Sequence, residues 1–475
     1  MNKRTWCLVT LFACAALLAA ACVPGTTAPN TPAVVPSVAP PTDTAAPPPT
    51  TLPTTVPPTA APPTAAATTA LPPTTVPSAV PSATAAPATA TPGSTATAVA
   101  GAIPRLAPGQ AITLTTIDML DASNGWGIGG LGNVGDHVLR TADGGHTWQD
   151  VTPPAQSAPD PSQAQPNQAT AYFADANLAW VIYGNFTTAA PASATVWHTT
   201  DGGQTWSGSL PIDLSSVPGV EFFQPSDLQV LPNGKSGWFI AHLGAGMNHD
   251  YFTVFKTDDG NKWSFIIDPT QGGPQSCRKT GMHFINAQTG LLTGDCQGVA
   301  PGFFYMRSDN AGAAWQSVAL SAPASQPDIF TRQDAGCGTY SLHFFDAQNA
   351  NVSLSCLVLS TNVISTTNFV YSTADGGQTW TSKPSPARSL TFLNPQVGWA
   401  LGTDDPGSQA PHPLSQTQDG GHTWTVVKQL AWTGQLDFID AQKGWAVAVA
   451  DQAISLVKTT DGGHTWQDVN PKMAP

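Results

Sequence analysis

One motif that contains a carboxylate recurs along the sequence beside glycine and tryptophan. The octapeptide Thr-x-Asp-x-Gly-x-Thr-Trp occurs seven times, twice in weakened form. Its aspartates could bind calcium or take part in catalysis. A calcium loop, however, alternates several oxygen ligands and usually includes a Glu, whereas each loop here has one carboxylate as the rule. We therefore predict structural aspartate loops with no metal and no cofactor. Their paired positions are Asp143 and Trp148, Asp201 and Trp206, Asp258 and Trp263, Asn310 and Trp315, Asp375 and Trp380, Asp419 and Trp424, and Asp461 and Trp466.

Four cysteines in the second half of the chain could form disulfides. Cys277 and Cys296 have the same spacing as Cys337 and Cys356, and both segments carry an Ala-Gln turn near the midpoint. Each pair should then face across a hairpin, so we predict the disulfides Cys277–Cys296 and Cys337–Cys356. Each would contribute about 3 kcal/mol to stability. Four buried thiols are the alternative.

The elements around each motif have the period of β-strands. An alternating run such as 436–439 is followed by a turn and a Gly-Trp segment, for example Gly444-Trp445. A third apolar run then leads into the Asp-Gly-Gly turn, which is a strong hairpin signal, and a fourth begins at the motif's Trp. Four strands repeated seven times predict an all-β fold, a seven-bladed β-propeller of four-stranded antiparallel blades at residues 105–475. The sequence does not show how such a ring closes.

The N-terminal segment is expected to be a targeting signal that is not part of the folded domain. Residues 1–21 have a charged start, a short apolar stretch and a small-residue end, which is typical of a signal peptide. Ala19-Ala20-Ala21-Cys22 resembles the bacterial lipobox, which implies lipidation at Cys22; ordinary secretion is the alternative. Residues 22–104 are almost only Pro, Thr, Ala, Ser and Val, which predicts a disordered stalk, either a spacer or a leftover of secretion. We expect a monomer on the outer face of the cell membrane, attached by lipid alone.

Composition excludes some partners. Only 10% of residues are charged and the net charge is −13, so a nucleic-acid partner, which needs a basic surface, is not expected. Glu221 is the only glutamate. Asp favours turns and Glu favours helices, so this usage agrees with an all-β chain.

The repeat resembles a known family. Residues 438–446, Phe-Ile-Asp-Ala-x-x-Gly-Trp-Ala, followed by the octapeptide, are similar to the bacterial neuraminidase repeat, or Asp box. The closest likeness is to the photosystem II stability and assembly factor family, with sialidases and sortilin-type receptors more distant. The resemblance spans about residues 111–470 and implies a seven-bladed propeller. It also implies, as one alternative, an assembly chaperone.

A sialidase-type glycoside hydrolase is the other alternative. That reaction needs an Arg cluster, a Tyr nucleophile with a Glu partner and an Asp acid. The family's early Arg-Ile-Pro motif is absent, and Glu221 is the one Glu available. We therefore expect a chain that is not an enzyme.

Loops of variable length suggest where a partner would bind. In a four-stranded blade the loops after the second and fourth strands share one face, opposite the Asp boxes, and loops on a rigid scaffold often carry function. We predict a non-enzymatic binding module for a protein or glycan. The candidate face comprises Asn248, His249, Asp250, Tyr251, Arg332, Asp334, Asp404, Asp405 and His412. His283 and His343, at equivalent places, are expected to line the core.

Overall fold

The structure is a computed structural model of the whole chain. It describes residues 103–154, 167–186, 189–246, 249–270, 278–295, 304–360, 363–402 and 411–475. The chain divides into two units, Met1–Thr91 and Pro92–Pro475, and every described residue belongs to the second. The predicted signal peptide, Cys22 and nearly all of the stalk therefore lie outside the described residues. Within the described residues, no helix has the length and apolar character that crossing a membrane requires.

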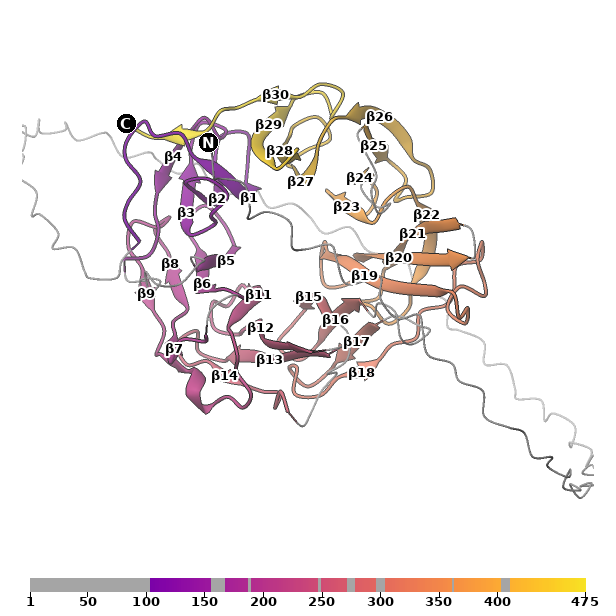
Figure 1. Cartoon of the computed structure of the whole chain (residues 1–475), viewed down its shortest axis with the longest axis horizontal. Coiled ribbons are helices and arrows are strands. Elements are labelled where there is room, and N and C mark those ends of the chain that lie inside the picture. Colours follow the sequence, from indigo (N-terminus) through magenta and orange to yellow (C-terminus); the bar gives the residue numbers. More distant parts are fainter. Residues whose placement is uncertain are drawn as a thin grey trace, which may run out of the picture. The chain divides into compact units, whose positions relative to one another are not determined.

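The regular elements among the described residues are β-strands apart from one short 3-10 helix, η1 (Leu214–Ser216), and turns and loops connect them. Sheets of four antiparallel strands follow one another in chain order, and in Figure 1 the sheets of this unit succeed each other around a common centre. The first sheet has the order β1-β2-β3-β4-β31, with β1 (Thr113–Met119), β2 (Gly125–Gly130), β3 (His137–Thr141), β4 (Thr147–Asp150) and β31 (Lys472–Met473). The second has the order β5-β6-β8-β9, with β5 (Gln168–Phe173), β6 (Ala179–Gly184), β8 (Trp197–Thr199) and β9 (Ser207–Gly208). The third contains β11 (Gln224–Val230), β12 (Gly237–Gly246), β13 (His249–Thr257) and β14 (Ser264–Phe265).

The later sheets repeat this order. Two four-stranded arrays are joined by the single pair Asp295–Gly338 into one eight-stranded sheet. Its strands are β15 (Arg278–Phe284), β16 (Gly290–Asp295), β17 (Phe304–Ser308), β18 (Gln316–Ser317), β19 (Ala335–Phe344), β20 (Ala350–Ser360), β21 (Val363–Thr373) and β22 (Thr381–Ser385). The last two sheets contain β23 (Ser389–Phe392), β24 (Gly398–Leu401), β25 (His412–Thr417) and β26 (Thr425–Leu430), then β27 (Thr433–Phe438), β28 (Gly444–Ala450), β29 (Ala453–Thr459) and β30 (Gln467–Asp468). A small ribbon pairs β7 (Ser193–Ala194) with β10 (Ile212–Asp213).

The expectation of uniform four-stranded sheets needs correction at two places. The first sheet has a fifth strand, because β31 near the C-terminus pairs in parallel with β4. Met473 is buried there, and its N–H donates to the carbonyl of Gln110 at 2.8 Å. The sequence did not show this strand, since two residues carry no alternation. The second correction is the eight-stranded sheet.

The Asp boxes have a recurring hydrogen-bond pattern. In the first box, the carboxylate of Asp143 accepts from the N–H of Thr147 at 2.8 Å and from its hydroxyl at 2.7 Å. The hydroxyl oxygen of Thr141 accepts from the N–H of Gly145 at 3.0 Å. The chain turns through Gly144 and Gly145, whose φ values of 73° and 93° favour glycine. Hydrogen bonds from Thr205 and Thr465 likewise lower the pKa of Asp201 and of Asp461 to about 2.

One box residue was assigned to the wrong position. In the third box the role belongs to Asp259 and not to Asp258. Asp259 accepts from the N–H groups of Asn261 and Lys262 and from the hydroxyl of Thr257. This loop is one residue shorter between Thr and Trp than the others, so counting back from Trp263 gives the wrong aspartate. Asp258 instead pairs with Lys256 and is exposed.

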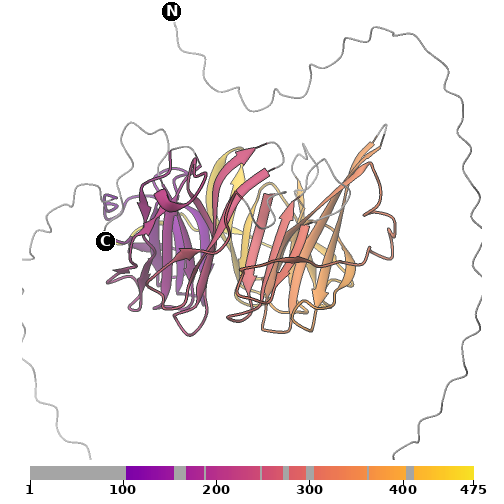
Figure 2. The ribbon, with the colours of Figure 1, turned by 90° about the horizontal axis from the view of Figure 1, so that it is seen from below.

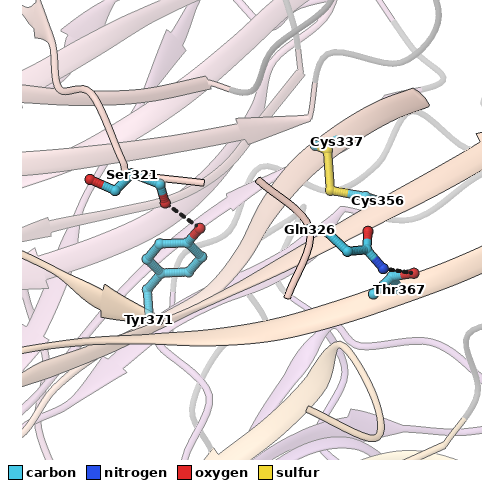
Figure 3. The surroundings of a disulfide bond; sticks show 6 residues. All are labelled: Ser321, Gln326, Cys337, Cys356, Thr367 and Tyr371. Atoms are coloured by element: carbon cyan, nitrogen blue, oxygen red, sulfur yellow. Dashed lines mark hydrogen bonds between the residues drawn. A yellow bond between two sulfur atoms is a disulfide. The ribbon is translucent and has the colours of Figure 1, made fainter. Parts of the chain in front are cut away.

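The Cys337–Cys356 disulfide is confirmed. The two residues are directly paired between β19 and β20. Nearby, the Tyr371 hydroxyl donates to the carbonyl of Ser321 at 2.8 Å, and Gln326 donates to the Thr367 hydroxyl at 3.3 Å (Figure 3). These bonds fasten the connection between β18 and β19 against β21. The predicted Cys277–Cys296 pair lies outside the described residues and stays a prediction.

Tryptophans pack adjacent sheets together. Trp399 of one sheet stacks on Phe438 of the next, with ring centroids 3.6 Å apart, and Trp238 stacks on Phe284 at 3.9 Å. Their indole N–H groups also reach the box of the next sheet, since Trp399 donates to the carbonyl of Gly462 at 3.1 Å. Trp445 of the last sheet makes the same bond to Gly144 of the first sheet at 3.0 Å. The last and first sheets are therefore joined as internal neighbours are.

Candidate functional site

Seven equivalent positions on the strands nearest the common centre carry polar side chains. In five sheets the position pairs with the Trp of the second strand, as Asp118 pairs with Trp126 and Asp437 with Trp445. The innermost strands are β1, β5, β11, β15, β19, β23 and β27 (Figure 1). We call these residues the inner-strand set: Asp118, Tyr172, Gln229, His283, His343, Thr391 and Asp437.

Members of the set reach from one innermost strand to the next. The side chain of Gln229 accepts from the N–H of Phe284 at 2.7 Å and donates to the carbonyl of the same residue at 2.9 Å. The carboxylate of Asp437 accepts from the N–H of Met119 at 2.6 Å. Two residues earlier on the same strand, Gln435 accepts from the N–H of Ile117 at 3.3 Å and donates to its carbonyl at 3.1 Å. The set thus links β11 to β15 and β27 to β1.

Two carboxyl groups of the set belong to adjacent innermost strands, and the charge of Asp118 contributes to the pKa shift of Asp437. Burial raises the pKa of Asp437 to about 7; the N–H of Met119 opposes this shift and the negative charge of Asp118 adds to it. Burial also raises the pKa of Asp118. The pKa of Tyr172 on the next strand is raised by burial and then by the charge of Asp118. Both carboxyl side chains keep some exposure to water.

The two histidines of the set lie on β15 and β19, which are successive innermost strands. The ring of His283 stacks on Phe344 with centroids 4.6 Å apart, and its Nε2 is 3.5 Å from Nε2 of Gln229. Burial lowers the pKa of His283 to about 4, and the neighbouring His343 adds to this. His343 itself is exposed, so it does not line the core as expected, while His283 is half-buried.

This arrangement suits acid–base chemistry. A carboxyl group whose pKa lies near neutrality can donate a proton, and a second carboxylate beside it can stabilise positive charge or activate water. Asp437 has a pKa near neutrality, and Asp118 lies on the adjacent innermost strand. Among the described residues, no group of three or more His, Cys, Asp or Glu side chains could hold a metal ion.

The predicted binding face is only partly described. Asp250 is buried rather than exposed: its carboxylate contacts Nδ1 of His242 at 2.9 Å and accepts from the N–H of Lys279 at 2.9 Å. Arg332 and Asp334 bond each other through two hydrogen bonds, at 2.9 and 2.7 Å. Tyr251 is exposed, while His412 at the start of β25 is buried. Asn248, Asp404 and Asp405 lie outside the described residues, and the side chain of His249 is not described.

Two long hairpins project from the described sheets. The hairpins β12–β13 and β20–β21 exceed their neighbours in length and project at the same end in Figure 2. Asp250 is on the first of them. Whether the face binds a partner stays a prediction.

Sequence reasoning missed the inner-strand set, although a signal was present. In each repeat the set residue stands directly before the last residue of the first strand, usually an aromatic, as in Thr391-Phe392 and Asp437-Phe438. Aligning the repeats on this apolar residue, which is Met119 and Val230 in two of them, would have shown that the preceding position is polar in all seven.

No family model and no curated protein matches this chain. Solved structures do. The chain is similar to the polysaccharide lyase PL25 ulvan lyase, at 14% identity and a TM-score of 0.40 over 62% of this chain and 82% of that one. It is similar to the Penicillium chrysogenum α-L-arabinanase, at 11% identity and a TM-score of 0.38 over 63% and 92% of the two chains. It is also similar to the GH74 xyloglucanase of Xanthomonas campestris, at 12% identity and a TM-score of 0.31 over 77% of this chain and 74% of that one.

One expectation is corrected by this comparison. We expected a chain that is not an enzyme, and the structures reported above are a lyase, an arabinanase and a xyloglucanase. The expectation is therefore withdrawn. At such identities and TM-scores the likeness assigns no reaction or substrate to this chain, so chemistry has to be argued from its own residues.

Proposed function

We propose that this chain is a carbohydrate-active β-propeller that hydrolyses a glycosidic bond, with Asp118 and Asp437 as its carboxylate pair. The observation that carries the proposal is the hydrogen bond from the N–H of Met119 to Asp437, which holds Asp437 against the strand that carries Asp118. The two aspartates occupy equivalent positions on adjacent innermost strands, and the pKa of each is raised. Glycoside hydrolysis commonly uses two carboxyl groups, one as acid and one as base or nucleophile.

The roles follow from the surroundings of each group. Asp437, whose pKa burial raises to about 7, would protonate the oxygen of the leaving sugar. Asp118 would act as the carboxylate that faces the sugar ring or activates water. Thr391 and Tyr172, in the same set, offer hydroxyl groups that can bind sugar hydroxyls.

The proposal does not extend to sialic acid. Binding its carboxylate would call for an arginine cluster, and the seven residues of the inner-strand set include no arginine. A neutral glycan fits better, because two coupled carboxyl groups would repel a negatively charged sugar.

The finer architecture belongs to the same proposal. We infer seven blades in a closed ring of Asp-box repeats, whose boxes resemble those of the photosystem II assembly factors. The inference is supported by the matched contacts of Trp445 with Gly144 and of Trp399 with Gly462. We also propose that lipidated Cys22 and the stalk hold the domain on the outer face of the membrane, where it meets its glycan.

The test is to incubate the full chain with a panel of neutral polysaccharides and to measure the reducing ends that hydrolysis releases. Asp437→Asn should abolish release, because the amide oxygen can still accept from the N–H of Met119 but the acid proton is lost. Asp440→Asn, in the exposed turn after the same strand, should leave the rate unchanged. Release by the Asp437→Asn variant at the rate of the unmodified chain would overturn the proposal.

A further inference from the structure

Three side chains of the third sheet lie in a line, apart from the carboxylate pair. The hydroxyl oxygen of Ser226 on β11 is 3.2 Å from Nε2 of His242 on β12. The other ring nitrogen, Nδ1, is 2.9 Å from the carboxylate of Asp250 on β13. Each nitrogen of the imidazole thus has one partner, a hydroxyl on one side and a carboxylate on the other.

The sheet register explains this alignment. Gln224 pairs with His242 and Ser226 pairs with Ile240, so Ser226 is a diagonal neighbour of His242 on the same face. On the other side of β12, His242 pairs with Phe252. Asp250 lies two residues before Phe252 and therefore shares that face. Neighbouring strands of one sheet thus supply the three groups.

Neighbouring residues hold His242 and Asp250 in place and shield them from most solvent. The side chains of His242 and Asp250 are 13% and 10% exposed. The ammonium group of Lys279 is fully buried, lies 3.9 Å from the Asp250 carboxylate and 4.1 Å from the centre of the Phe252 ring. Burial alone would raise the pKa of Asp250, but the bond with His242 and the contacts of Lys279 outweigh it and lower the pKa. Asp250 is therefore held as a carboxylate.

A strained residue follows the hydroxyl directly. Asp227 has a φ of 51°, which is unfavourable for a residue with a side chain, and such strain is frequent at functional sites. Its carboxyl group accepts from the N–H of Met282 at 3.2 Å. Burial raises the pKa of Asp227, which favours its neutral form. Asp250 and Asp227 are thus the carboxyl groups that interact with His242, and Lys279 lies beside Asp250.

We propose that Ser226, His242 and Asp250 form a nucleophilic site that hydrolyses a carboxylic ester. A hydroxyl, an imidazole and a carboxylate in this order are the arrangement that activates serine for acyl transfer. The site uses other residues and cleaves another bond than the glycosidic chemistry proposed above, so either proposal can fail without the other.

The reaction balances with water as the second reactant. The Ser226 oxygen bonds to the ester carbonyl carbon while its proton moves to Nε2 of His242. The ester C–O bond then breaks, and the alcohol leaves with that proton. Water attacks the acyl-serine, giving its proton to Nε2, and the carboxylic acid departs as the Ser226 hydroxyl forms again. Asp250 is a positioning residue, because it holds the Nδ1–H that keeps Nε2 free to accept.

A serine-reactive fluorophosphonate probe tests the site on the unmodified full chain. After labelling and digestion, mass spectrometry should find the phosphonyl group on Ser226. Labelling of other serines only, or of none, would overturn the proposal, and this result does not depend on whether any variant folds.

Variants add a second measurement, hydrolysis of p-nitrophenyl acetate. Ser226→Ala should lower kcat by about 10³-fold or more. The matched control is Ser389→Ala, since Ser389 pairs with Leu401 at the same register as Ser226 with Ile240. Asp250→Asn should lower kcat with KM and the near-ultraviolet circular dichroism unchanged, which a merely structural role would not produce. Full activity of Ser226→Ala would contradict the proposal.

Discussion

The carboxylate of Asp437 accepts a hydrogen bond from the backbone N–H of Met119, which lies 318 positions earlier in the chain, at 2.6 Å. The internal junction between β11 and β15 has the same kind of contact, in which Gln229 bonds Phe284. The last innermost strand is thus joined to the first by the contact that joins internal neighbours. This contact also brings Asp437 next to Asp118, the second carboxylate of the proposed site.

Removing an indole N–H should lower the free energy of unfolding as much between the last and first sheets as between two successive sheets. Trp445→Phe takes away the donor to the Gly144 carbonyl, and Trp399→Phe takes away the donor to the Gly462 carbonyl. Each change leaves a backbone acceptor without its bond, which costs about 1–3 kcal/mol. Chemical unfolding measures both free energies. A loss for Trp399→Phe with none for Trp445→Phe would contradict the joining of the last and first sheets.

The raised pKa of Asp437 should make stability depend on pH. Its pKa is about 7 in the folded chain and near 3.8 in the unfolded one, so the folded state binds more protons between these values. The free energy of unfolding should therefore fall as pH rises from about 4 to 7. Asp437→Asn does not titrate, so its stability relative to the unmodified chain should rise over the same window.

Asp440→Asn is the control for this pH dependence. Hydrogen bonds from Gln442 and Lys443 lower the pKa of Asp440, so the stability it contributes is present above its unfolded pKa and lost as pH falls. Its difference from the unmodified chain should then shrink as pH falls below about 4 and vanish below the lowered pKa of the folded state. The same pH window for both variants would argue against the assignment to Asp437.

Much of the fold followed from local pattern, while the site did not. The Trp of each box and the Gly-Trp segment locate the strands, because alternation and the Asp-Gly turn are properties of a few adjacent residues. Which of Asp258 and Asp259 closes the third box depends on loop length, and β31 depends on pairing with β4 far along the chain. Asp118 and Asp437 come near each other because the last innermost strand lies against the first. These strands are far apart in the sequence, so no short stretch of residues contains both. The line of Ser226, His242 and Asp250 likewise depends on strand register.

Two adjacent aspartates of the third box should differ in importance. Asp259→Ala removes the acceptor of two backbone N–H groups and of the Thr257 hydroxyl, so the turn loses its internal bonds. The melting temperature should fall by about 2 °C or more. Asp258→Ala, one residue earlier, loses only an exposed ion pair with Lys256 and should leave the melting temperature nearly unchanged. Differential scanning calorimetry of the two variants separates these outcomes; the reverse ranking would restore Asp258 to the box.

A second disulfide should be present beside Cys337–Cys356. Cys277 and Cys296 have the same spacing in the sequence as Cys337 and Cys356, so we expect them to form a disulfide as well. Intact-mass measurement before and after reduction should show the hydrogen gain of two disulfides. A gain that corresponds to one disulfide would leave Cys277 and Cys296 as thiols.

The proposed carboxylate pair exists only if β27 is held against β1, and hydrogen exchange at one amide measures this directly. The N–H of Met119 should exchange slowly in the unmodified chain. Asp437→Ala should raise its exchange rate by about tenfold or more, while the N–H of Phe284, bonded to Gln229, keeps its rate. A Met119 amide that exchanges as fast as an unstructured residue, or that does not respond to Asp437→Ala, would contradict the account.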